Sequence, residues 1–166
     1  MTKLTQQNFS AGQVAAIVGV SPTIINSWCN LGHIVGHKTL GKGHRREFTF
    51  YNLMEIAGAV ALMEIGLTSP ADAFRASAQF AHFGDGHLPG LPHRAEEGET
   101  FLAISGQLSN VLLSEKGEIN TRRAFPMHRK LAGLILLNVT EVFKAVVAKM
   151  DTGSTWVQIL NEEYGH

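Results

Sequence analysis

Two groups of side chains in the first fifty residues have the chemistry needed to bind nucleic acid. The first group consists of small, uncharged polar residues that helical spacing places on one face of a short helix, namely Thr23, Asn26, Ser27 and Asn30. Amide and hydroxyl groups of this kind form hydrogen bonds with the edges of DNA bases in the major groove. We therefore predict that these four residues contact bases.

The second group is basic and follows the first along the chain. It consists of Lys38, Lys42, His44, Arg45 and Arg46. Cationic side chains bind phosphate oxygens and fix the register of a reading helix without reading sequence themselves. Residues 1–50 carry a net charge of +4, whereas residues 84–166 carry −2. This asymmetry indicates that the N-terminal part meets a polyanion, for which we predict double-stranded DNA.

Metal binding and catalysis are not predicted. The chain has eight histidines, but none shows the compact spacing of a metal site, and the residues between His33 and His37 are typical of a strand. A single cysteine, Cys29, excludes an intramolecular disulfide and a zinc site built on several thiolates. Motifs for phosphate loops, nucleophile elbows and dinucleotide binding are absent from the sequence, so we expect neither an enzyme nor a cofactor.

Two short helices joined by a tight turn must position the polar face. Ser10 with Gln13 three residues later is a capping box, and Gly19 suits the left-handed position that ends a helix. Ser21 caps the second helix, and Pro22 occupies its first helical position. Helices with this spacing are typical of a helix-turn-helix, whose second helix enters the major groove.

A hairpin must position the basic group. Residues 34–35 and 46–48 are short strand candidates on either side of a glycine-punctuated tip at 41–44. Directly after a helix-turn-helix, such a basic hairpin is typical of a wing. Two further helices, capped by Thr49 and Ser69, are expected to support the reader from within the core.

Residues 84–98 separate the two halves of the chain. Four glycines and two prolines interrupt any periodic pattern there, which predicts a linker or a long surface loop. Before it, residues 8–83 contain their own caps and apolar stripes, and we expect them to fold alone as a winged helix-turn-helix. The predicted fold class is mainly α with small β, with a small α+β module after the linker.

The α+β module is predicted at residues 99–150 and is followed by a tail at 151–166. Three strand-length apolar runs precede an amphipathic helix that begins near Val139. The module and its tail, residues 99–166, together have only 68 residues and bury little core alone, so we expect them to pack on a second copy and make a homodimer. The residues predicted to form this interface are Val142, Phe143, Val146, Trp156 and Leu160. For the apolar residues of the tail, the alternative stays open that they cover the sheet of their own chain.

Composition excludes several classes of protein. Hydrophobic residues make up 45% of the chain and charged residues 17%, which argues against disorder and low complexity. An uninterrupted apolar run long enough to cross a membrane is absent from the sequence, and its first residues lack the apolar segment of a secretory signal. We therefore expect a cytoplasmic protein without membrane contact.

In their order along the chain, these motifs resemble the MerR superfamily of winged helix-turn-helix proteins. The matching segments are Phe9–Ala15, Val20–Thr23, Gly32–Ile34, Gly43–Thr49 and Ile65–Ser69, with Trp28 at an aromatic position. The resemblance covers about residues 9–83 and implies a reading helix in the major groove with the wing on phosphates. The chain departs from the family at Asn26, where an arginine is usual, and the long coiled-coil helix and metal-binding cysteines of family activators do not follow.

The resulting functional prediction is a sequence-specific, DNA-binding regulator of transcription that reads two half-sites as a homodimer. Two alternatives stay open. One is an excisionase-like or DNA-packaging accessory protein of a phage or mobile element, which uses the same module to bend or bundle DNA. The other is an antitoxin-like adaptor whose helix-turn-helix contacts a protein.

Overall fold

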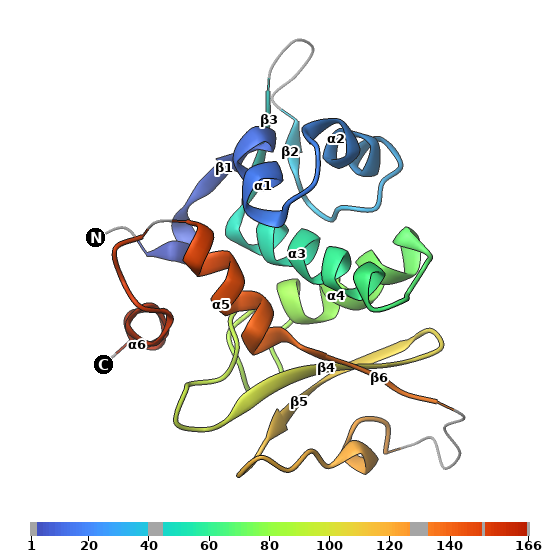
Figure 1. Cartoon of the computed structure of the whole chain (residues 1–166), viewed down its shortest axis with the longest axis vertical. Coiled ribbons are helices and arrows are strands. Elements are labelled where there is room, and N and C mark those ends of the chain that lie inside the picture. Colours follow the sequence, from blue (N-terminus) through green and yellow to red (C-terminus); the bar gives the residue numbers. More distant parts are fainter. Residues whose placement is uncertain (1–2, 40–44, 127–132, 151, 166) are drawn as a thin grey trace.

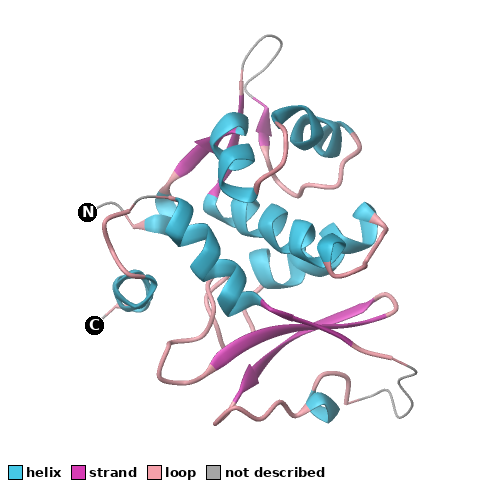
Figure 2. Cartoon of the chain, viewed as in Figure 1, coloured by secondary structure: helices cyan, strands magenta, loops and turns pink. Residues whose placement is uncertain are grey.

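The computed structural model describes residues 3–39, 45–126, 133–150 and 152–165. Helices and strands both contribute substantially, so the fold is mixed α and β. Figures 1 and 2 show one sheet near the upper end of the molecule, a second sheet at the lower end, and long helices between them. Within the described ranges, no helix combines the length and the apolar character needed to cross a membrane.

Helix α1 (Ala11–Val18) is capped as predicted. The Ser10 hydroxyl accepts a hydrogen bond from the Gln13 N–H, and the Gln13 side chain accepts one from the Ser10 N–H. The helix ends at Gly19, whose φ of 78° lies in the left-handed region that favours glycine. The turn that leads into the next helix is therefore set by local chemistry.

Helix α2 (Pro22–Asn30) begins at the Ser21 cap, whose hydroxyl accepts from the Ile24 N–H. Its buried residues are Ile25, Trp28 and Cys29. Burial of this stripe leaves the opposite side of the helix facing solvent. Both helices of the predicted pair are thus confirmed.

The first sheet has the order β1-β3-β2 and is antiparallel throughout. It consists of β1 (Asn8–Ser10), β2 (Lys38–Thr39) and β3 (Arg46–Thr49). The predicted strand at residues 34–35 is wrong, because these residues form a bend and the strand begins at Lys38. The hairpin of β2 and β3 is confirmed, while the predicted tip at 41–44 lies outside the described residues.

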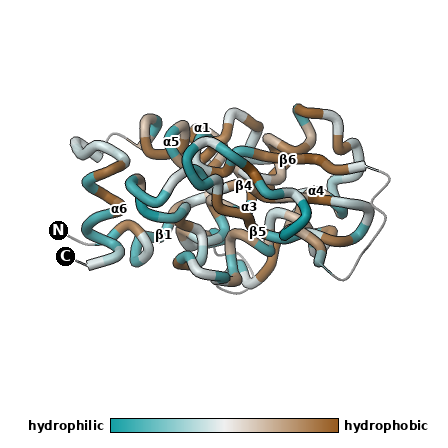
Figure 3. Tube along the Cα trace, turned by 90° about the horizontal axis from the view of Figure 1, so that it is seen from below, coloured by the Kyte–Doolittle hydropathy of each residue, from teal (hydrophilic) through white to brown (hydrophobic). Residues whose placement is uncertain are grey.

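Helix α3 (Phe50–Glu64) is the centre of the molecule, and α4 (Pro70–His82) packs along it. Residues on several sides of α3 are buried, so the helix is enclosed rather than amphipathic. At the closest approach of the two helices, a Cβ added at Gly58 would collide with the Ser77 hydroxyl. Figure 3 shows hydrophobic residues along α3 and the strands beside it.

The second half contains the predicted strands and helix. Strands β4 (Glu99–Ser105), β5 (Leu108–Ser114) and β6 (Ile135–Asn138) form an antiparallel sheet in the order β5-β4-β6. Helix α5 (Val139–Lys149) follows β6 directly, and α6 (Trp156–Tyr164) packs against α5. The predicted tail is therefore largely helical.

One hydrophobic core crosses the expected boundary between the halves. It contains Phe50 and Phe74 from the first half together with Leu102, Val139 and Phe143 from the second. The rings of Phe50 and Phe143 meet edge to face with their centroids 6.4 Å apart. We therefore revise the predicted division into an independent reader and a separate module.

The segment at residues 84–98 is docked on the core. The His93 N–H donates to the Thr100 hydroxyl at 2.8 Å. The Tyr164 hydroxyl of α6 accepts from the Leu88 N–H and donates to the Pro92 carbonyl. The segment is a loop, as predicted, but its contacts make it part of the packing between the halves rather than a free linker.

The predicted interface between copies requires a correction. Phe143, Val146 and Leu160 are buried within their own chain, so they have no surface left to offer a second copy. Val142 and Trp156 are half-buried, and the Trp156 ring carries the Lys144 ammonium 4.6 Å from its centroid. The apolar stripe of α5 packs against α3 in the core of the same chain. We had predicted that a second copy would cover this stripe.

Both ends of the described chain meet at α6. A short 3-10 helix (Leu4–Gln6) lies against it, and Glu163 accepts from the Thr5 N–H at 3.0 Å and from the Thr5 hydroxyl at 2.7 Å. Figure 1 shows the two termini on the same side of the molecule. The N-terminal segment is therefore fastened by residues from the far end of the chain.

A fragment ending at residue 98 tests the shared core. We expect it to lose the cooperative thermal transition of the full chain, because α3 and α4 would expose large apolar side chains worth about 1.5–3 kcal/mol each on burial. Circular dichroism during heating measures this. A sharp transition in the fragment at a temperature like that of the full chain would show that the first half folds independently, as the sequence predicted.

The pH dependence of stability tests the docked loop. Burial holds the pKa of His93 below its ordinary value, His87 adds to this effect, and Glu97 and Asp85 oppose it more weakly. Unfolded chains take up this proton near pH ~6.5, so the free energy of unfolding should fall as the pH drops through that value toward the lowered pKa. His93→Asn should remove this part of the slope in urea titrations at several pH values. An unchanged slope in the variant would contradict the assignment.

Candidate nucleic-acid interface

The open face of α2 carries the predicted base-contacting residues. Thr23, Ser27 and Asn30 are exposed, and Asn26 is half-buried. This placement follows from the buried stripe on the opposite side of the helix. Because α2 contains no charged residue, hydrogen bonding and shape are the means by which its own side chains can bind another molecule.

Arg46 of β3 joins the wing to this face. Its Nη1 donates to the main-chain carbonyl of Asn26 at 3.1 Å and to the Asn26 side-chain oxygen at 3.0 Å, while Nη2 donates to the side-chain oxygen of Asn30. Two predicted base contacts and one predicted phosphate contact thus share one hydrogen-bonded group. The guanidinium occupies the amide oxygens, so the amide nitrogens of Asn26 and Asn30 are left to donate outward.

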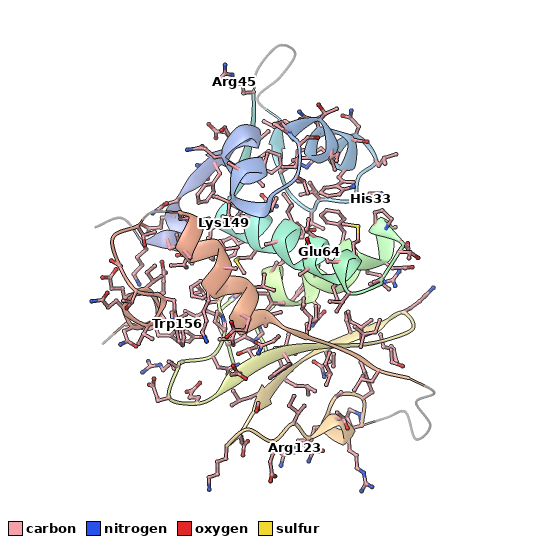
Figure 4. All side chains as sticks on the ribbon, in the orientation of Figure 1. His33, Arg45, Glu64, Arg123, Lys149 and Trp156 are labelled. Atoms are coloured by element: carbon pink, nitrogen blue, oxygen red, sulfur yellow. The ribbon has the colours of Figure 1, made fainter. Side chains whose placement is uncertain are left out.

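The rest of the basic group is distributed along the wing. Lys38 lies in β2 opposite Glu47 of β3. Arg45 is exposed and projects near the end of the hairpin, beyond α2, as Figure 4 shows. Lys42 and His44 lie outside the described residues. The structure therefore brings Arg46 to α2 and places Arg45 away from it.

Sequence reasoning missed an apolar component of the same surface. Ile24 is 43% exposed and Leu31 is 65% exposed, at the two ends of α2. Their spacing with Ser27 puts all three on one side of the helix, so helical periodicity could have identified them. Apolar side chains in the major groove contact thymine methyl groups, and they also suit contact with a protein.

A buried polar group fastens the connection between α2 and the wing. The Asn52 side-chain amide donates to the Val35 carbonyl, and the Glu55 carboxylate accepts from the Val35 N–H at 3.1 Å. On its other side, Glu55 lies 2.9 Å from His82 Nε2 at the end of α4. The Glu55 side chain is fully buried. Helix α3 therefore sets where the chain leaves α2 and enters the hairpin.

The signal for this group was visible in the sequence as an acid inside an apolar run. Glu55 follows Leu53 and Met54 and precedes Ile56, all buried residues. We read the run only as core. An acidic residue at such a position is rare unless its charge has partners, and this rule could have flagged it.

Cys29 and two histidines of the first half pack against neighbouring groups. Burial raises the pKa of the Cys29 thiol, while the Arg46 charge opposes this effect, so the thiol stays neutral near pH ~7. The rings of His33 and His37 stack on Phe74 and Phe48 at centroid distances of 6.0 and 6.2 Å. Among the residues that the structure describes, no group of three or more side chains is arranged to hold a metal ion.

Comparisons with known proteins do not add to this picture. No protein-family model matches the chain, and a search of curated proteins finds no significant match. The resemblance to the MerR superfamily therefore stays a prediction that depends on the motifs and their order.

Replacing Glu55 tests whether α3 holds the connection. Glu55→Ala leaves the Val35 N–H and the His82 ring nitrogen without their shared partner and opens a cavity in the core, so the free energy of unfolding should fall by about 2–4 kcal/mol in urea titrations. Glu55→Gln should cost less, because its amide oxygen still accepts from the Val35 N–H. The matched control is Glu64→Ala, an exposed acid on the same helix, with an expected change within about 0.5 kcal/mol. Equal losses for Glu55→Ala and Glu64→Ala would show that the carboxylate fastens nothing.

Proposed function

We propose that this protein is a sequence-specific DNA-binding regulator of transcription, acting in the cytoplasm with α2 in the major groove and the β2–β3 wing on the phosphate backbone. The observation that carries the proposal is the joint surface of α2 and β3. Polar side chains of α2 lie beside Arg46 of β3, which donates three hydrogen bonds to Asn26 and Asn30. A helix and a hairpin joined in this way suit the combined recognition of bases and backbone.

The side chains divide into reading and positioning roles. Thr23 and Ser27 are free to pair with base edges, and Asn30 offers its amide nitrogen because Arg46 occupies its oxygen. Such donors suit the acceptors that purines and thymine present in the major groove. Arg45, which stands off the helix on the wing, suits a phosphate contact that fixes orientation without reading sequence.

Charge supports the same arrangement. Residues 1–50 carry a net +4, and Glu47 is the acid among them. DNA binding then releases counterions from the duplex, so affinity should fall steeply with salt. A homodimer that reads two half-sites remains part of the proposal, with an interface away from the core-facing side of α5.

One observation favours a second candidate function. Ile24 and Leu31 expose apolar surface on the reading face of α2. Such surface suits an adaptor whose helix-turn-helix contacts another protein, and an apolar contact of this kind responds little to salt. The salt dependence of binding therefore separates the two candidates.

Binding-site selection from a random duplex library, followed by anisotropy titrations, tests the proposal. On the selected duplex, Asn30→Ala should cost about 1–3 kcal/mol, with little change on a scrambled duplex. Arg45→Ala should weaken both duplexes alike and reduce the salt slope by about one unit. The control is Arg123→Ala, an exposed arginine at the far end of the molecule in Figure 4.

Three results would count against DNA reading. They are the enrichment of no sequence, an affinity that ignores salt, and equal losses for Asn30→Ala on both duplexes. The first two together would favour the adaptor. The third would leave a DNA binder whose α2 does not read bases.

A further inference from the structure

A groove lies where the two halves of the chain meet, on the side of α4 that faces away from α3. Its walls come from residues 32–35 after the reading helix, from one face of α4, and from residues 107–109 at the turn between β4 and β5. Its volume is about 590 Å³. Sites for small molecules commonly enclose roughly 300–1,000 Å³, so the groove has room for one.

The groove gathers exposed apolar side chains. Val35 is 51% exposed, Phe83 59% and Leu108 38%, and each comes from a different wall. Phe74 also lines the groove, with its ring stacked on His33 at 6.0 Å. Large apolar side chains exposed together mark binding surfaces more often than isolated ones do. A flat, apolar ring matches walls of this kind.

The polar lining is cationic and amide-rich. Arg75 contributes a guanidinium whose Nη1 is bonded to Asp72 at 2.7 Å, while its other nitrogens have no hydrogen bond to any described residue. Gln79 and Gln107 place amide groups along the same walls. No acidic residue lines the groove within the described ranges. Asp72, the acid bonded to Arg75, is not among the residues that line the groove. The guanidinium nitrogens that Asp72 leaves free, together with the amide groups, suit an anionic group, and an arginine binds a carboxylate especially well.

We propose that this groove binds a small aromatic carboxylate, with the ring between Val35, Phe83 and Leu108 and the carboxylate at Arg75. Among the described residues, none of those predicted to contact DNA lines the groove, so the test of this site is independent of the proposed function.

Three naphthalene probes whose polar groups are anionic, neutral and cationic test the proposal on the full chain. They are naphthoate, naphthamide and naphthylmethylammonium, and NMR titration follows the backbone amides of Gln79, Gln107 and Ser109. Naphthoate should bind about tenfold more tightly than naphthamide, and the ammonium should bind most weakly. Arg75→Gln should abolish the preference for naphthoate, whereas Leu108→Ser should weaken all three probes.

Matched controls come from outside the groove. Arg123→Gln removes an exposed arginine, and Ile65→Ser removes an apolar side chain that is 54% exposed, so neither should alter binding. Because the groove variants change exposed residues, their spectra should remain those of the folded chain. Failure of all probes to bind, equal affinities for the three, or equal effects of Arg75→Gln and Arg123→Gln would overturn the proposal. Self-association that Leu108→Ser abolishes in light scattering would assign the groove to a second copy instead, and would overturn it too.

Discussion

The enclosure of α3 is the constraint on which the rest of the structure depends. A helix covered on nearly all sides must give every polar side chain on it a partner, because an unpaired buried polar group costs free energy. Asn52 and Glu55 meet this requirement by binding the peptide groups of Val35. The same bonds fix the path from α2 into the wing. Core packing and the geometry of the candidate interface are therefore consequences of one arrangement.

Local signals in the sequence were enough to predict the first part of the fold. The caps at Ser10, Ser21, Thr49 and Ser69 all form, because each depends on atoms within three residues along the chain. Strands β4 and β5 and the helix after β6 were predicted from apolar patterns, which are also local in the sequence. Strand bounds were less accurate, since a bend at residues 34–35 is set by α3 and not by the residues that bend.

The errors share a cause in contacts between distant residues. Apolar stripes on α5 and α6 indicate that these faces are buried, but they do not show which surface covers them. A core contact within the chain was therefore predicted as an interface between copies. Arg46 was assigned to phosphate by its charge, and its bonds to Asn26 and Asn30 could not be read from one sequence. Of the candidate site, residue types and the open helix face were predictable, whereas the pairing among the side chains was not.

Because of that pairing, the side chains at positions 26, 30 and 46 act as one hydrogen-bonded unit. An exchange at either asparagine removes an acceptor from the guanidinium, and an exchange at Arg46 releases two amides at once. Substitutions at the three sites are therefore not independent, and a change of recognition by one residue at a time would pass through intermediates with an unpaired group. During evolution, substitutions at these three positions are therefore expected to occur together.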